Sequence, residues 1–188
     1  MKPLITYDPK FNRTDAELEG FFLFCICVAG KNADRTVKAI NRLFKPTQRP
    51  TYFLRRLCKT KKLHGKLKEQ GFGQYSRIEG AIHQWLDSKL NLRTCTIEEL
   101  EQIHGIGPKT ARMFVSLTRP KTNVAILDVH ILRWLRSKGI DAPAQTPTGK
   151  RYLALETKYL ALAKKEHRDP ITMDYEIWKE SRSAIQPK

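Results

Sequence analysis

The residues best suited to chemistry lie in the segment His104-Gly-Ile-Gly107, which is followed by Pro108 and Lys109. A proline directly after a glycine-containing turn indicates that a helix begins there. A tight turn between two short helices exposes backbone N–H groups, which together with the helix dipole bind a phosphate oxygen without reading base sequence. Its glycines permit positive φ and a close approach of the phosphate. The segment therefore predicts a grip on a nucleic-acid backbone, with an ordinary helix–helix turn as the alternative.

A second candidate is Asp128, nineteen residues after Lys109, in the run Ala125-Ile-Leu-Asp-Val-His-Ile-Leu-Arg-Trp134. The aspartate stands where the N-cap of a helix belongs. Taken singly, Lys109 can be one more surface lysine and Asp128 a plain helix cap. The hairpin, the lysine, the interval and the Asp-Val-His sequence together indicate a catalytic site.

These features resemble the helix-hairpin-helix DNA glycosylase superfamily, whose hairpin ends in Gly-Xaa-Lys and is followed by Asp-Xaa-His. The resemblance covers roughly residues 14–180 and is most specific over residues 100–134. It implies that Asp128 is the catalytic acid. It also implies that Lys109 is the nucleophile of members that combine glycosylase and AP lyase activity.

The chemistry explains why these two residue types are required. Displacing a base from C1′ builds positive charge on the sugar, and a nearby carboxylate such as Asp128 stabilises that charge. A neutral Lys109 amine can attack C1′ and form a Schiff base, after which β-elimination of the 3′ phosphate is easy. The positive end of a helix dipole disfavours an ammonium group and favours a carboxylate. Both residues are thus predicted to lie at helix starts.

The resemblance also assigns DNA contacts. His130 corresponds to a phosphate contact, residues 30–32 to the side chains that fill the hole left by a flipped nucleotide, and Gln74 or Tyr75 to a second wedge. A helix-surface histidine and a helix-ending glycine with solvent-facing neighbours are the alternatives. The predicted DNA-binding positions are Gly105, Gly107, Lys109, His130, Gly30, Lys31, Asn32, Gln74 and Tyr75.

Further positions concern the base, a cation and a cofactor. Met113 and Trp178 are candidates for the base pocket, although a tryptophan in Asp174-Tyr-Glu-Ile-Trp178 can equally be core. The family places a Na⁺ or K⁺ ion on hairpin carbonyls, here those of Ile103 and Ile106. Some members carry four C-terminal cysteines for an iron–sulfur cluster, but no cysteine follows Cys95. No cofactor is therefore predicted, and the four cysteines are interpreted as free thiols.

The sequence around Asp128, the interval and the Asp-Tyr-Glu-Ile-Trp tail are most similar to the compact 8-oxoguanine DNA glycosylase/AP lyases. The predicted function is excision of a damaged base, 8-oxoguanine before others, through a lysine Schiff base. The alternatives are a glycosylase for an oxidised pyrimidine, mismatched thymine or alkylated base, and a non-catalytic DNA-binding module.

Amphipathic periodicity predicts an all-α protein. The resemblance implies one two-lobed glycosylase domain over residues 1–188, with the active-site cleft between the lobes. Residues 33–134 form the central lobe with the hairpin at 97–117, and residues 1–30 plus 135–188 form the other lobe. The predicted helices span residues 15–29, 33–44, 51–69, 75–90, 97–103, 108–117, 128–138, 150–167 and 172–183.

Composition indicates the partner. Thirty-five Lys+Arg against 19 Asp+Glu give a net charge of +16, which favours a polyanion such as double-stranded DNA carrying a damaged base. The run Lys59, Lys61, Lys62, Lys66 and Lys68 can follow phosphates or form a solvated face. The apolar segment 20–29 is preceded by acidic residues and is too short to cross a bilayer. We therefore expect no membrane partner and an intracellular monomer, cytoplasmic or nucleoid-associated, or nuclear in a eukaryote.

Overall fold

The computed structural model describes residues 3–6, 8–45 and 48–183. Every regular element in this part of the chain is a helix. The predicted all-α class is thus confirmed. The chain divides into two compact units, unit 1 over residues 1–106 and unit 2 over residues 107–188. The boundary between them falls inside the predicted hairpin.

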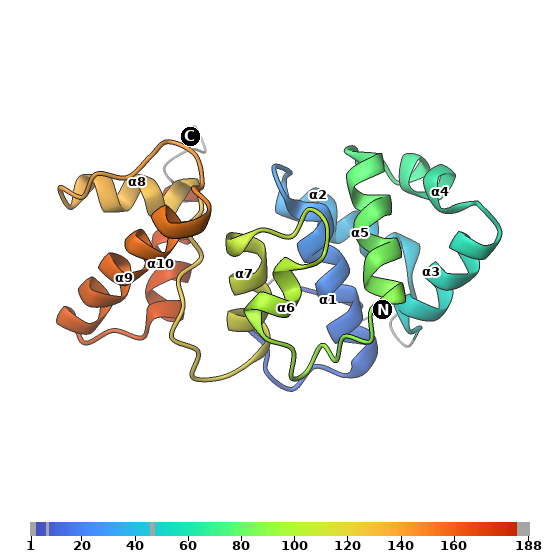
Figure 1. Cartoon of the computed structure of the whole chain (residues 1–188), viewed down its shortest axis with the longest axis horizontal. Helices are drawn as coiled ribbons and strands as arrows, with labels where there is room; N and C mark the ends of the chain where they lie inside the picture. Colours follow the sequence, from blue (N-terminus) through green and yellow to red (C-terminus); the bar gives the residue numbers. More distant parts are fainter. Residues whose placement is uncertain (1–2, 7, 46–47, 184–188) are drawn as a thin grey trace. The chain divides into compact units, whose positions relative to one another are not determined.

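Unit 1 contains the first six helices (Figure 1): α1 (Asp15–Val28), α2 (Ala33–Leu43), α3 (Pro50–Lys59), α4 (Leu63–Glu69), α5 (Tyr75–Asp87) and α6 (Ile97–Glu101). Helix α1 packs against α2, α3 and α5. It therefore belongs with residues of the predicted central lobe, whereas the sequence analysis grouped residues 1–30 with residues 135–188. The pairing of those two segments stays a prediction.

Helix α1 is the centre of unit 1. Phe21, Phe22 and Cys25 are fully buried, and burial continues on all sides of the helix from Leu18 to Val28. A helix that is apolar all round must be surrounded by other elements, which explains why segment 20–29 is apolar without crossing a bilayer. A Cβ on Gly20 would lie 2.8 Å from Ile5. Glycine thus lets the N-terminal segment pack directly on α1.

Local side-chain bonds fix where helices begin. Thr96 caps α6: its hydroxyl accepts from the Glu99 N–H at 3.2 Å, and the Glu99 carboxylate accepts from the Thr96 N–H at 2.8 Å. The same reciprocal capping box joins Thr14 and Glu17 at the start of α1, where the sequence analysis did not identify it.

The predicted helical region 51–69 is interrupted. Helix α3 ends at Lys59, and α4 begins at Leu63. Between them Lys61 has φ 55°, and the Lys62 N–H bonds to the Leu57 carbonyl at 2.9 Å, which closes the helix end. Glycine usually occupies such a left-handed position, so a lysine there gave no sign of the break. Helix α5 also ends at Asp87, three residues before the predicted Leu90.

Unit 2 contains α7 (Pro108–Thr118), α8 (Val129–Ser137), α9 (Gly149–Lys165) and α10 (Pro170–Ser183), and Figure 1 shows the last three side by side. Helix α10 packs against both α8 and α9. Tyr152 is fully buried in their core. Its hydroxyl donates to the Ala125 carbonyl at 2.7 Å and accepts from the Leu127 N–H at 3.1 Å. Tyr152 therefore anchors the extended segment that leads to Asp128.

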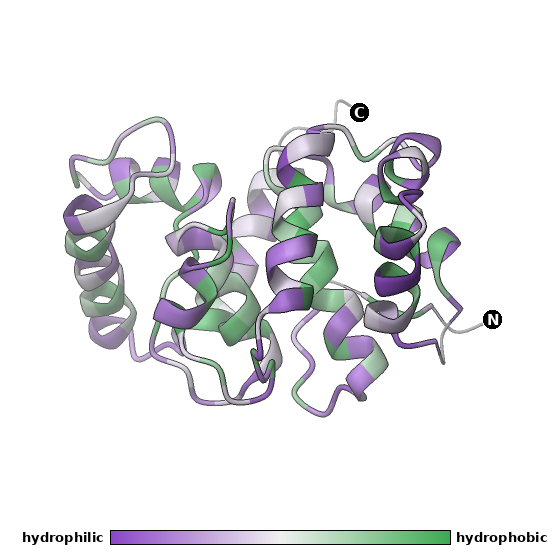
Figure 2. Ribbon diagram, turned by 45° about the vertical axis from the view of Figure 1, so that its right-hand side comes forward, coloured by the Kyte–Doolittle hydropathy of each residue, from purple (hydrophilic) through white to green (hydrophobic). Residues whose placement is uncertain are grey.

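Figure 2 shows hydrophilic and hydrophobic residues alternating along the helices, the pattern of elements with one buried face. Among the described residues, no helix combines the length and the apolar character that a bilayer crossing requires.

Candidate active site

The turn of the predicted hairpin is closed by a bond from the Ile106 N–H to the Ile103 carbonyl at 2.9 Å. Gly105 has φ 76°, a left-handed conformation that glycine adopts without strain. Gly107 is different, because its φ of −98° suits any residue and a Cβ there would meet nothing within 4 Å. Nothing within the described protein therefore requires glycine at position 107. Its lack of a side chain keeps the approach to the start of α7 open.

One face of α5 holds the hairpin within unit 1. Arg77, Gly80 and Gln84 lie on it at helical spacing. The Arg77 side chain passes under Gly105, where a Cβ would come within 2.9 Å of the arginine Cγ. The His104 N–H donates to the Gln84 Oε1, and Gly80 leaves room for the His104 ring, 3.5 Å from where a Cβ would stand. The α5 face thus fixes the hairpin position.

Arg77 also ties the predicted wedge to this face. Its Nε donates to Gln74 Oε1 at 2.7 Å, and its guanidinium donates to the Ile26 carbonyl near the end of α1 at 2.9 Å. The sequence analysis did not identify Arg77. A usable signal was present, because a cation in the first turn of a helix opposes the helix dipole and needs acceptors from elsewhere.

The structure brings the other predicted wedge residues together in unit 1. Gly30 and Lys31 follow α1 and are exposed, and the Lys31 Nζ lies 2.7 Å from where a Cβ on Gly73 would stand. A Cβ on Gly30 would lie 3.7 Å from the Gln74 amide nitrogen. Asn32 is engaged locally, since its Oδ1 caps α2 by accepting from the Arg35 N–H at 3.0 Å.

Gln74 and Tyr75 are placed differently. Gln74 is exposed and has φ 47°, so it stands at the tip of the turn before α5. The ring of Tyr75 packs edge-on against His64, with ring centroids 5.7 Å apart. Of the two wedge candidates, Gln74 is therefore the accessible one.

Lys109 is the second residue of α7 and is half-buried. The N-cap of α7 is Gly107, so the cap residue itself offers no side chain to the helix start. Arg112, one turn further on, is buried, and its Nε donates to Glu156 Oε1 at 2.7 Å. The same carboxylate oxygen accepts from the Ala125 N–H at 2.9 Å. This buried pair joins the α7 helix of Lys109 to α9 and to the segment that precedes Asp128.

Asp128 caps α8, as predicted. Its Oδ1 accepts from the His130 N–H at 2.8 Å and from the Ile131 N–H at 3.0 Å. Both bonds go to the same oxygen, and Asp128 is half-buried. The carboxylate is therefore oriented by the helix start, as an electrostatic role in a reaction demands.

A third titratable group, Asp174 of α10, shares the surroundings of Lys109 and Asp128. Burial is the main cause that raises the pKa of Asp174 well above its ordinary value, and the charge of Asp128 raises it further. A hydrogen bond from the Ile126 backbone and the charge of Lys109 act in the opposite direction. The sequence analysis quoted this residue in its C-terminal motif but gave it no role, because nothing local distinguishes it.

Three further predicted positions, His130, Met113 and Trp178, lie in unit 2. His130 is half-buried, and its Nδ1 is enclosed without a hydrogen-bond partner among the described residues. Met113 is buried on α7. Trp178 is half-buried and stacks on Tyr175, with ring centroids 6.1 Å apart. The roles of these three residues stay predictions.

The basic run lies on α3, α4 and the turn between them. Lys59, Lys61, Lys62 and Lys68 are exposed, and Lys66 pairs with Glu69 at 2.6 Å. No three metal-binding side chains of the described residues gather in one place. Cys25, Cys27 and Cys95 are buried, and burial raises the pKa of the Cys27 thiol to about 12.

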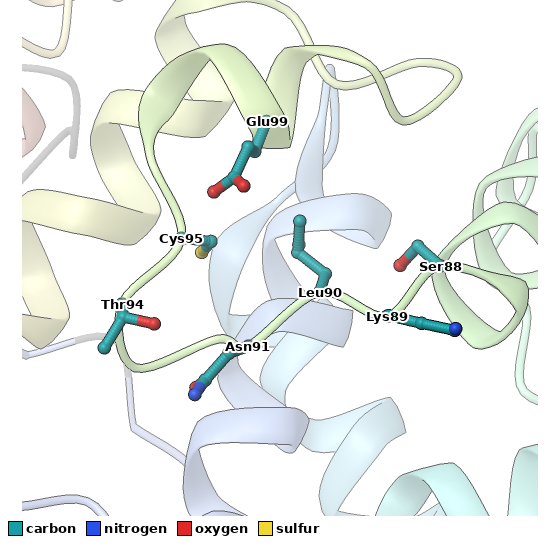
Figure 3. A pocket seen from close by; sticks show the side chains of 7 residues that line it. All are labelled: Ser88, Lys89, Leu90, Asn91, Thr94, Cys95 and Glu99. Atoms are coloured by element: carbon teal, nitrogen blue, oxygen red, sulfur yellow. The ribbon is translucent and has the colours of Figure 1, made fainter.

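A surface pocket of about 360 Å³ lies elsewhere in unit 1. It is lined by Ser88, Lys89, Leu90, Asn91, Thr94, Cys95 and Glu99, which extend from the end of α5 to the beginning of α6 (Figure 3). None of the predicted site residues lines it. We therefore assign it no part in the candidate active site.

Comparison with known proteins gives the family. No solved structure matches the chain. The sequence model of 8-oxoguanine DNA glycosylase matches residues 7–167, a range that includes the hairpin, Lys109 and Asp128. Because this match extends over most of the sequence, it establishes that the chain belongs to the 8-oxoguanine DNA glycosylase family, within the helix-hairpin-helix DNA glycosylases.

Proposed function

We propose that this DNA glycosylase removes 8-oxoguanine from duplex DNA and then cleaves the strand as an AP lyase, with Lys109 as nucleophile and Asp128 as the stabilising carboxylate. The observation that carries the proposal is the placement of both side chains in one unit, each at a helix start. They share the surroundings of the buried Asp174. Since both groups belong to one chain, a monomer suffices for the reaction.

The first step is displacement of the base. The neutral Lys109 amine attacks C1′ while the C1′–N bond breaks and its electron pair leaves with the base. Positive charge develops on the sugar, and the Asp128 carboxylate, held by two N–H groups of α8, stabilises it. Fixing the carboxylate beforehand avoids reorganisation at the moment of reaction.

The second step is strand cleavage. The ring opens to a Schiff base between Lys109 and C1′, a proton leaves C2′, and the C3′–O bond breaks with release of the 3′ phosphate. The positively charged nitrogen of the Schiff base accepts the electrons of the C2′–H bond.

The DNA grip is proposed to use the hairpin. Open space at Gly107 and the positive end of the α7 dipole suit a phosphate oxygen. His130 would contact a neighbouring phosphate, Gln74 and Lys31 would occupy the gap left by the extruded base, and Trp178 with Met113 would hold that base.

The hairpin carbonyls are suited to the Na⁺ or K⁺ ion of the family. The Ile103 carbonyl already accepts one N–H bond, but a carbonyl oxygen has a second lone pair for a cation. A cation there, held by the Ile103 and Ile106 carbonyls, would add positive charge for a phosphate. We propose no iron–sulfur cluster.

The test compares two lysines in matched positions. Lys109 and Lys150 each occupy the second residue of a helix in unit 2. Lys109→Gln should abolish strand nicking and borohydride trapping on DNA that contains 8-oxoguanine, while duplex affinity stays within a few-fold. Lys150→Gln should keep both activities.

The same assay decides between the alternatives when it is run over a panel of lesions. Trapping only on another lesion would replace 8-oxoguanine as the substrate. Absence of base release and trapping from the folded wild-type protein on every lesion would favour a non-catalytic DNA-binding module. Undiminished trapping by Lys109→Gln would show that another amine is the nucleophile.

A further inference from the structure

Asp174 is a buried carboxyl group that the reaction described above does not use. Its side chain is only 9% exposed, and its Oδ2 is enclosed without a hydrogen-bond partner in the part of the chain that the structure describes. Burying an unsatisfied carboxyl oxygen is costly. A protein keeps such a group where a proton or a ligand makes use of it.

The groups around Asp174 come from every helix of unit 2. Lys109 belongs to α7, Asp128 to the start of α8, and Tyr152 and Tyr159 to α9. Both tyrosine hydroxyls donate elsewhere, Tyr152 to the Ala125 carbonyl at 2.7 Å and Tyr159 to the Pro170 carbonyl at 2.9 Å. Among the described residues, Lys109 and Asp128 are the charged groups that act on Asp174, whereas Arg112 and Glu156 act on Tyr152.

The position of one proton decides how many charges Lys109, Asp128 and Asp174 carry together. An ammonium on Lys109 with carboxylates on Asp128 and Asp174 places three charges in a poorly solvated site. Moving one proton from Lys109 to Asp174 leaves Asp128 as the single charge and produces the neutral amine that attack requires. Two carboxyl groups whose surroundings differ in this way divide the roles of acid and electrostatic stabiliser.

We propose that Asp174 accepts the proton that Lys109 must lose and passes it to the departing base. This inference rests on the proposed function. In the resting site, ammonium and carboxylate become amine and carboxylic acid. When the Lys109 nitrogen bonds to C1′ and the C1′–N bond breaks, the base leaves with the electron pair and takes the Asp174 proton. The alkylated Lys109 nitrogen then returns a proton to the Asp174 carboxylate, so protons and electrons balance.

The decisive variant is Asp174→Asn, which keeps the shape but can neither accept nor donate this proton. At neutral pH single-turnover base release should fall by about 10²–10⁴-fold. The remaining rate should rise about tenfold for each pH unit, because solvent must now deprotonate Lys109. Wild-type release should depend only weakly on pH over that range, and duplex affinity should be unchanged in the variant.

The matched control is Asp169→Asn. Asp169 lies in the same unit directly before α10, is exposed, and accepts from the Thr172 N–H at 2.8 Å. Its variant should keep the wild-type rate and the wild-type pH profile. Asp174→Asn should also regain borohydride trapping on preformed abasic DNA as the pH is raised.

The outcomes separate the two proposals. If folded Asp174→Asn releases base at the wild-type rate with the wild-type pH profile, the role of Asp174 is wrong while Lys109 chemistry stands. If Lys109→Gln is still trapped on DNA by borohydride, the proposed role of Lys109 is wrong, and the inference about Asp174 is refuted with it. A low rate in Asp174→Asn that does not recover at high pH would indicate a structural role only, and would overturn the proton transfer.

A measurement on the wild-type protein covers the case in which Asp174→Asn does not fold. With ¹³C-labelled aspartate carboxyl groups, one resonance should titrate well above the ordinary range for aspartate. That titration should move in Lys109→Gln, because its cationic partner has been removed. Ordinary titration of every aspartate would overturn the inference.

Discussion

Asp128 and Asp174 show how different the surroundings of two aspartates in one unit can be. Asp128 is half-buried and accepts two N–H bonds at the start of a helix, which stabilise a negative charge. Asp174 is buried and leaves one oxygen unpaired, which favours the protonated form. The residue type alone distinguishes neither of them.

Asp128→Asn should lower base excision by several orders of magnitude, since an amide cannot offset charge that develops on the sugar. The amide oxygen still accepts N–H bonds, and asparagine caps helices about as well as aspartate. Thermal unfolding should therefore change little. Single-turnover excision and a melting curve provide the two measurements, with Asp169→Asn as the control cap in α10. Wild-type excision by Asp128→Asn would refute the mechanism whatever the fold.

At the scale of elements, the hairpin and the predicted wedge share one support. Arg77 on α5 contacts Gly105 of the hairpin and bonds both to Gln74 and to the last turn of α1. The hairpin and the turn that carries Gln74 therefore both contact the same arginine side chain. Gly105 and Gly107 of this hairpin are constrained differently. Substitutions at the two positions should therefore have different effects on stability and on DNA binding.

Gly105→Ala should lower the free energy of unfolding by about 1–2 kcal/mol, because φ 76° strains any residue with a Cβ and Arg77 occupies the space. Gly107→Thr should leave that free energy within about 0.5 kcal/mol, since its backbone is extended and threonine is a suitable N-cap.

Gly107→Thr should nevertheless weaken duplex binding by about 1–3 kcal/mol, because its side chain blocks the N–H groups offered to a phosphate. Denaturant unfolding and binding to undamaged duplex measure the two effects. Wild-type affinity in a folded Gly107→Thr would show that the phosphate binds elsewhere.

At the scale of the whole molecule, a net charge of +16 governs association with DNA. Neutralised phosphates release counterions, so log affinity should fall linearly with log salt, by about 0.9 for each phosphate contacted. If the hairpin contacts a phosphate through N–H groups rather than side-chain charge, as proposed, its contribution to the affinity should depend little on salt.

Replacing Lys61 and Lys62 by glutamine should flatten this salt dependence by about one to two units if both exposed side chains contact phosphates. Gly107→Thr is the control with the opposite expected result. It should reduce the affinity for DNA while the slope of log affinity against log salt stays nearly unchanged. Binding measured across a salt series distinguishes the two. An unaltered slope in the lysine variant would show that this part of the basic run is a solvated face.

Some features of this protein were determined by the sequence itself. The cap of Thr96 by Glu99, the cap at Asp128 and the stop of α8 at Gly139, with φ 77°, depend on residues within a few positions of one another. Their geometry is local, so a short stretch of sequence is enough to determine it. The family followed from the same local pattern around the hairpin, the lysine and the aspartate.

Other features were decided only by tertiary structure. Asp174 reaches the surroundings of Lys109 because α10 packs against α8 and α9, and Arg77 meets Gly105 because α5 supports the hairpin. The break at Lys61 depends on a left-handed residue that is not glycine. Such contacts join segments far apart in the chain, and the free energy that selects them comes from burial, which no single stretch of sequence contains.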